Sequence, residues 1–267
     1  MIEVINENFP RGPFQAAIFD FDGTISLIRR NWQDVMIPMM VEVLAETGTE
    51  ETKEELAEIV EEFVMRLNGK QTIYQMIRLA EEVDKRGGTS KEPLDYKHQY
   101  HDLLWKQVGE RVESVRSGAV EAERLTVPGV EPLLSRLQDA GTTLYLASGT
   151  DLKYVRDELA VLKLDHFFGE RVYGALDDYK KFSKAMIVQQ IVEDSGVPSN
   201  KLVGFGDGFV EIEEVQKVGG LAVGVASNED TRQGVNDWKR NRLIQAGAQV
   251  IVGDYSELDE LQQTIGM

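Results

Sequence analysis

The chain has 267 residues, 29 lysines and arginines against 46 aspartates and glutamates, a formal net charge of −17, and 42% hydrophobic residues. This length and composition are typical of a globular protein with one large domain or two modest ones. The negative charge repels phosphate backbones and anionic lipid surfaces, and no stripe of lysine and arginine offsets it, so we expect neither a nucleic-acid nor a membrane partner.

The sequence contains no cysteine. This excludes disulfides, thiolate zinc sites and cysteine nucleophiles, and it fits a reducing compartment. The segment from Met1 to Glu7 has neither the basic start nor the apolar stretch of a secretory signal. Apolar runs elsewhere are far shorter than the roughly 20 residues that cross a bilayer. We therefore expect a cytoplasmic protein, and the sequence leaves its oligomeric state open.

Short apolar runs, most of them closed by a polar residue or glycine, recur along the chain, and each suits a buried parallel strand. They occupy residues 16–20, 142–147, 202–206, 221–226 and 249–252, with a weaker run at 171–174. Helical patterns lie between them at 130–140, 152–162, 183–194 and 211–218. This alternation predicts an α/β fold, a Rossmann-like core built on a parallel sheet.

The segment 25–127 has a different pattern: no convincing strand, and apolar residues at helical spacing between glycine-containing turns. We therefore predict an all-helical cap domain at 25–127, inserted into a core formed by 1–24 and 128–267. Because the insertion follows the first strand directly, it should sit above the carboxyl ends of the strands. Ligands bind at that edge in open α/β sheets.

Two carboxylates stand two residues apart at the first strand tip, in Asp20-Phe21-Asp22-Gly23-Thr24. One carboxylate held at a strand end suits a nucleophile toward phosphorus, and a second suits a group that protonates a leaving oxygen and then activates water. The alternative is an acidic turn that caps the next helix.

Two later strand tips carry further polar groups. Ser148, Gly149 and Thr150 offer a hydroxyl and backbone N–H groups at an expected helix start, where phosphate oxygens bind, although a serine N-cap has the same pattern. Asp207 and Glu211 stand four residues apart after another tip, a spacing that suits Mg²⁺ coordination, directly or through water. The alternative there is a glycine-rich turn with a carboxylate at a helix N-terminus.

In this order, the three tips resemble the haloacid dehalogenase (HAD) superfamily, whose first motif is Asp-x-Asp-Gly-Thr, whose second is a Ser or Thr after a strand, and whose fourth is Gly-Asp-x-x-x-Asp. The resemblance covers residues 16–23 and about 127–261. It implies a Mg²⁺-dependent phosphatase with a helical cap that acts on a small phosphorylated metabolite. Because Asp22 is present, dehalogenase chemistry is disfavoured.

The resemblance implies a role for each matching residue. Asp20 corresponds to the nucleophile that forms an aspartyl-phosphate, Asp22 to the general acid/base, and Thr24 to a substrate-binding residue that supports their site. Ser148, with Gly149, corresponds to the group that binds the phosphoryl. Mg²⁺ would be held by Asp207, the Asp20 carboxylate and the Asp22 backbone carbonyl.

The family's remaining motif is a lysine, which must come from the segment Lys180 to Lys184. Its usual distance from the fourth motif favours Lys184, with Lys181 as the alternative. Glu211 stands where the family usually has aspartate, so it could ligate the metal directly or through water. Arg29 and Arg30 follow the first motif and suit either a substrate contact or a solvated helix start.

Two alternatives to the phosphatase remain. One is a phosphomutase on the same scaffold, in which the phosphoryl returns to a second hydroxyl. The other is a non-catalytic regulatory protein that binds phosphate or metal, suggested by the unusual Val210 and Glu211. The sequence does not name the phosphorylated substrate.

Overall fold

The computed structural model, which describes residues 1–194 and 196–267, contains a seven-stranded sheet with the order β1-β7-β6-β5-β2-β3-β4. The strands are β1 (Ile2–Val4), β2 (Ala16–Phe19), β3 (Thr143–Asp151), β4 (Val172–Ala175), β5 (Leu202–Gly206), β6 (Leu221–Val225) and β7 (Val250–Val252). All neighbours pair in parallel except β1 and β7. The α/β class with a mainly parallel sheet is therefore confirmed.

Helices follow most of the strands, as the alternating pattern predicts. They are α1 (Gln33–Ala45), α2 (Lys53–Leu67), α3 (Thr72–Lys85), α4 (Pro93–Arg116), α5 (Val130–Asp139), α6 (Leu152–Val161), α7 (Asp165–Phe168), α8 (Lys184–Asp194), α9 (Phe209–Lys217), α10 (Asp237–Gln245) and α11 (Leu258–Ile265), with short 3₁₀ turns at Ala122–Leu125, Tyr179–Lys181 and Ser199–Lys201. None of the helices within the described residues is long and apolar enough to cross a membrane.

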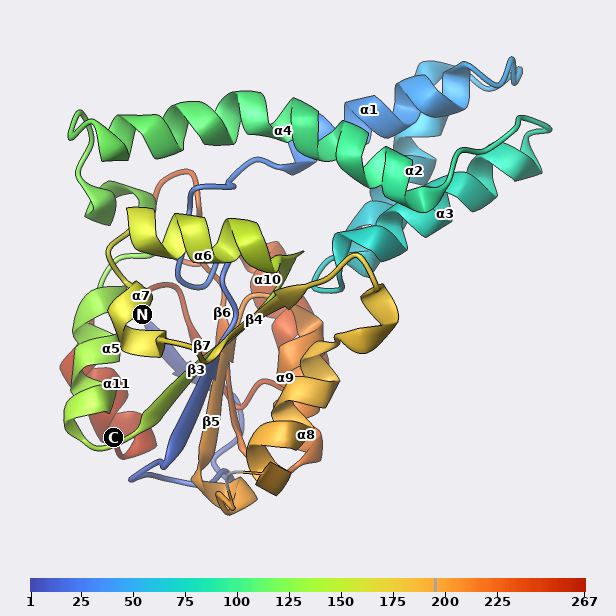
Figure 1. Ribbon diagram of the computed structural model, residues 1–267. Helices are drawn as coiled ribbons and strands as arrows, with labels where there is room; N and C mark the ends of the chain where they lie inside the picture. The colour runs from blue at the N-terminus through green and yellow to red at the C-terminus, as the bar shows by residue number, and fades with distance from the viewer. Residues whose placement is uncertain (195) are drawn as a thin grey trace. The chain divides into compact units, whose positions relative to one another are not determined.

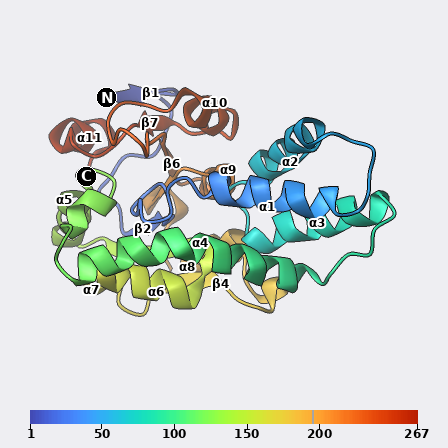
Figure 2. The same cartoon turned by 90° about the horizontal axis from the view of Figure 1, so that it is seen from above.

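The described chain divides into two compact units, Met1–Arg30 with Ser114–Met267, and Asn31–Glu113. The first unit contains the sheet, with α5 and α11 on one side and α8 and α9 on the other (Figure 1). The second is helical, and α1, α2 and α3 are neighbours within it (Figure 2). The helical insertion between β2 and β3 is thereby confirmed, whereas its predicted boundaries at residues 25 and 127 stay predictions.

Alternate residues of β2 face opposite sides of the sheet, as a pleated strand requires. Ala16 and Ile18 join an apolar cluster that includes residues from α8, α9 and α10. Phe19, on the other side, stacks on Phe205 with ring centroids 4.7 Å apart and meets the edge of Phe168 at 6.2 Å. Because both faces are buried, β2 is apolar throughout and its first polar residue, Asp20, marks its end.

The loop after β2 is tied to the entrance of α5 through Tyr255. The Tyr255 hydroxyl donates a hydrogen bond to the Thr24 carbonyl at 3.1 Å, and its backbone N–H donates to the Pro128 carbonyl at 2.9 Å. Gly129, the N-cap of α5, has a φ of 79° and lies directly against the Tyr255 backbone. The turn needs glycine both for this backbone conformation and for this close approach.

We expect Gly129→Ala to destabilise the protein far more than Gly141→Ala. Both glycines have positive φ, so both substitutions cost about 1 kcal/mol of backbone strain. A Cβ at Gly129 would lie 2.5 Å from the Tyr255 carbonyl, whereas one at Gly141 meets nothing within 4 Å. Displacing backbone should cost about 2 kcal/mol more in the free energy of unfolding, measured by urea denaturation. Equal losses in the two variants would contradict this account of the turn.

Candidate active site

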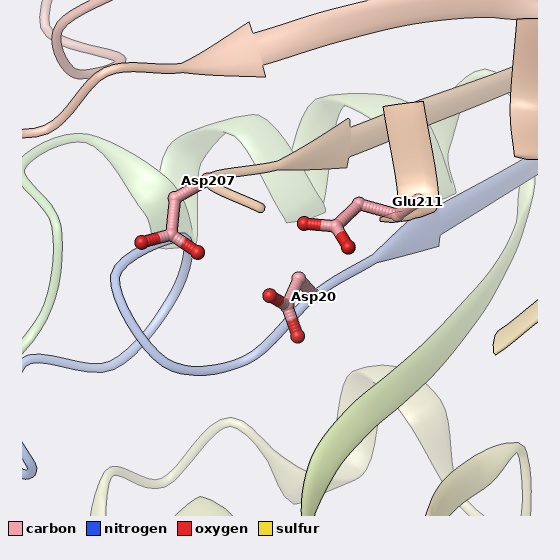
Figure 3. Close-up of side chains that lie close together, drawn as sticks. All are labelled: Asp20, Asp207 and Glu211. Carbon is pink, nitrogen blue, oxygen red and sulfur yellow. The ribbon is translucent and has the colours of Figure 1, made fainter. Parts of the chain in front are cut away.

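Three carboxylates meet where β2 and β5 end. The two strands pair in parallel with Phe19 opposite Phe205, so Asp20 and Asp207 leave the sheet at the same edge. Glu211 lies in the first turn of α9, which follows β5. Figure 3 shows the three carboxylates turned toward a common space, and one oxygen of each lies within 4.8 Å of the others. The strand register therefore brings together acids from distant parts of the sequence.

Lys184 supplies a positive charge to this cluster. It is the first residue of α8, its side chain is 5% exposed, and its Nζ lies 2.9 Å from Asp20 Oδ1 and 2.9 Å from Glu211 Oε2. Burial opposes its charge, but the two carboxylates outweigh burial and raise the pKa of Lys184. Lys181, by contrast, is exposed and pairs with Asp178. The structure thus places Lys184, and not Lys181, beside Asp20.

The positive charge of Lys184 does not fully offset the effect of burial on the Asp20 carboxylate. Burial raises the pKa of Asp20 well above its usual value, Lys184 lowers it, and the neighbouring Glu211 and Asp207 raise it further. An ionised Asp20 therefore needs another cation close by. Carboxylate oxygens are the hard ligands that divalent cations such as Mg²⁺ prefer, so the donor set fits the group that the sequence implies.

Asp22 has a different environment two residues along the chain. Its Oδ2 accepts a hydrogen bond from the Thr150 hydroxyl at 2.7 Å, and its buried Oδ1 has no hydrogen-bond partner within residues 1–194 and 196–267. Burial raises the pKa of Asp22 to about 7, against the lowering effect of Arg29. A carboxyl group with this pKa can both give and accept a proton near neutral pH.

The predicted phosphate-binding residues lie in the same unit. Ser148 is buried, and its Oγ accepts a hydrogen bond from the Thr150 N–H at 3.0 Å. Ser148 and Gly149 belong to β3, which runs on to Asp151 through an irregular register, so α6 begins at Leu152 rather than at the serine. Thr24 is fully buried in the turn after β2.

Glu211 has donors within the chain for both carboxylate oxygens. Oε1 accepts the Gly208 N–H at 2.6 Å, which caps α9, and Oε2 meets Lys184. These contacts favour a Glu211 that orients Lys184 and the loop of Asp207. They leave Asp207 and Asp20, each with one oxygen outside a lysine pair, as the more accessible metal ligands.

Two buried ion pairs at this edge were not predicted. Arg29 forms a bidentate ion pair with Glu158 of α6. Its Nη2 lies 2.6 Å from Glu158 Oε1, and its Nε lies 3.0 and 3.1 Å from the two carboxylate oxygens. Arg29 is therefore buried, contrary to the solvated alternative. Lys239 of α10 pairs with Asp207 Oδ2 at 2.8 Å. Neither ion pair can be recognised from a sequence motif, because the two partners lie far apart in the sequence.

The comparisons with known proteins agree with this geometry. A family model described as haloacid dehalogenase-like hydrolase matches residues 14–219, which is more than half of the chain. The chain therefore belongs to the haloacid dehalogenase-like hydrolases. Among curated proteins, none matches this sequence.

Solved structures of similar fold include a predicted phosphoglycolate phosphatase from Haemophilus somnus (17% identity, TM-score 0.59, covering 94% of this chain and 98% of that one). A HAD family hydrolase from Deinococcus radiodurans with bound phosphate and sodium has 18% identity and a TM-score of 0.52, with 94% and 96% covered. A β-phosphoglucomutase from Clostridium difficile has 16% identity and a TM-score of 0.60, with 95% and 97% covered. At these identities the likeness concerns the fold.

We expect Arg29→Met to destabilise the protein by about 3–5 kcal/mol, because it leaves the Glu158 carboxylate buried without its cation. Glu158 is 0% exposed, so water cannot replace the guanidinium. The control is Arg29→Met combined with Glu158→Leu, which removes both charges and should recover most of the loss. Denaturant unfolding measures both effects. If the double variant is no more stable than the single one, the ion pair is not the cause.

Proposed function

We propose that this protein is a Mg²⁺-dependent phosphatase that hydrolyses a small phosphomonoester through an aspartyl-phosphate on Asp20. The observation that carries the proposal is the placement of the Asp20 carboxylate at the tip of β2, with Lys184 Nζ at 2.9 Å and the Asp207 carboxylate beside it. Such an arrangement combines a nucleophile with the positive charge that its anionic substrate requires.

The residues of the chain divide the first chemical step between them. A carboxylate oxygen of Asp20 attacks phosphorus, and the bond from phosphorus to the leaving oxygen breaks. Asp22, as the carboxylic acid, gives its proton to that oxygen. Lys184 compensates the charge shared by Asp20 and the phosphoryl oxygens, while Ser148 and Gly149 bind those oxygens.

The second step releases the product. The Asp22 carboxylate accepts a proton from a water molecule whose oxygen attacks phosphorus, and the acyl phosphate bond to Asp20 breaks. Inorganic phosphate leaves, and both aspartates return to their starting protonation states. Asp20, Asp207 and the Asp22 backbone carbonyl would hold Mg²⁺, which supplies positive charge to the transferring phosphoryl group.

Release of inorganic phosphate is the experiment that tests this proposal. The purified protein is offered phosphoglycolate and a panel of phosphorylated sugars, amino acids and nucleotides, with Mg²⁺ and with EDTA. The phosphatase predicts Mg²⁺-dependent phosphate release from at least one small phosphomonoester. A phosphomutase, which the β-phosphoglucomutase of similar fold makes the second candidate, predicts an isomeric phosphoester with little phosphate release. Absence of both products would favour the non-catalytic alternative.

We expect Asp20→Asn to abolish turnover while the protein stays folded. An amide has nearly the shape of the carboxylate but cannot attack phosphorus. The rate of phosphate release should fall below about 1% of the wild-type value, since loss of a nucleophile costs many orders of magnitude. A melting temperature close to that of the wild type serves as the control. Substantial turnover by a folded variant would rule out Asp20 as the nucleophile.

We expect Lys184→Ala to lower turnover at least about a hundredfold, because a buried charge beside the transferring phosphoryl is lost. Lys180→Ala and Lys181→Ala are the matched controls, since both lysines belong to the turn before α8 and Lys181 pairs with the exposed Asp178. Their rates should stay within about threefold of the wild type. If Lys181→Ala loses activity and Lys184→Ala retains it, the active-site lysine is Lys181.

A further inference from the structure

Lys239 is a buried lysine that the proposed reaction does not use. It lies in the first turn of α10, where the Asn236 side chain caps the helix by accepting the Lys239 N–H at 3.0 Å. Its residue is 7% exposed. Leu243 of the same helix belongs to the apolar cluster that packs against the sheet, and α10 contacts β6. These contacts fix the position of the helix. The side chain is thereby directed to the edge of the sheet where Asp207 lies.

The ammonium group of Lys239 has three partners. It lies 2.8 Å from Asp207 Oδ2 and 2.5 Å from Glu229 Oε1, and it donates to the Ser227 Oγ at 3.2 Å. Ser227 in turn donates to the Gly23 carbonyl at 2.6 Å. All three donors of the ammonium group are thus used, and they join the loops that follow β2, β5 and β6.

Lys239 remains charged in this setting. Burial opposes the charge, but the carboxylates of Asp207 and Glu229 outweigh burial and raise the pKa of Lys239. Gly23 allows the close packing, since a Cβ there would lie 2.2 Å from Asp207 Oδ2 and 3.0 Å from Lys239 Nζ. The loop after β2, Asp207 and Lys239 therefore pack directly against one another.

A fixed cation on Asp207 acts on any metal that binds the same carboxylate. It occupies Oδ2, so a metal must use the other oxygen, and its charge repels a divalent cation one carboxylate away. Lys239 also holds the carboxylate in place, which would favour binding. In a buried site with little screening, the charge effect on a dication is the larger of the two.

We propose that Lys239 limits the affinity of the acidic centre for Mg²⁺, with Glu229 as the counter-charge that partly offsets it. This inference rests on the proposed function, since it concerns the metal of that same site. The consequence is a centre that binds Mg²⁺ weakly by itself and gains from the negative charge of a phosphorylated ligand. Lys239 is in this sense a positioning and charge-setting residue, with no contact to reacting atoms required.

The test is the dissociation constant for Mg²⁺, measured by isothermal titration calorimetry on metal-free protein without any phosphate. Lys239→Met should tighten Mg²⁺ binding at least about tenfold, because a nearby positive charge is removed. Glu229→Gln should weaken binding about threefold, because the lysine charge then meets Asp207 alone. Lys239→Arg keeps the charge and should stay close to the wild type.

Two further variants separate charge from structure. Arg240→Met removes the same charge from the next position of α10, where Arg240 pairs with Glu3, and should change Mg²⁺ affinity less than about twofold. Lys239→Met combined with Glu229→Gln removes the pair with no net charge change. It should still bind Mg²⁺ more tightly than the wild type, because Lys239 contacts Asp207 directly at 2.8 Å, and it serves if the single variant does not fold.

The outcomes distinguish this inference from the proposed function. If neither the wild type nor either Lys239→Met variant binds Mg²⁺, the proposed metal site fails. If the wild type binds Mg²⁺ and both Lys239→Met variants bind it equally or more weakly, Lys239 only positions Asp207, and the inference is overturned while the proposed function stands. Tighter binding in both, with weaker binding in Glu229→Gln, supports it.

Discussion

Burial of several carboxylates at one edge of the sheet is the constraint on which this molecule depends. Asp20, Asp207 and Glu211 lie within reach of one another, and buried like charges cost several kcal/mol unless cations or protons compensate them. The compensation comes from Lys184 and Lys239, each in the first turn of its helix. Both helices contribute to the same apolar cluster against the sheet. Packing of α8 and α10 therefore delivers the positive charge to the carboxylates.

The strand tips could be predicted because their signal is local. In a strand buried on both faces, the apolar run ends where the first polar residue emerges, so Asp20 and Asp207 are visible without any tertiary information. The edge strand β1 and α10 were not predicted. β1 has only three residues, and α10 buries just Lys239 and Leu243, so it has no apolar stripe. Lys239 was missed because its helix was missed.

Glu211 is one methylene group longer than the aspartate that the family usually has at this position, and the surrounding structure accommodates the extra length. Its longer side chain lets one carboxylate cap α9 at Gly208 and still reach Lys184. The Glu211 side chain passes over Gly206, where a Cβ would lie 2.1 Å from Glu211 Cγ. Glycine at 206 and glutamate at 211 are therefore physically dependent on each other. The sequence shows both residues but not this contact, which needs the turn between β5 and α9.

Asp20 and Asp22 are two residues apart but have different electrostatic environments, and this difference supports the division of labour proposed for them. Burial raises the pKa of Asp20, but Lys184 pairs with it directly and opposes this effect, and a metal beside it would oppose it further. Asp22 meets a neutral hydroxyl from Thr150 and an arginine whose charge is largely balanced by Glu158. Burial without a full counter-charge raises the pKa of Asp22 to about 7. Two neighbouring carboxyl groups with such different partners can serve as a nucleophile and as a proton carrier in one reaction.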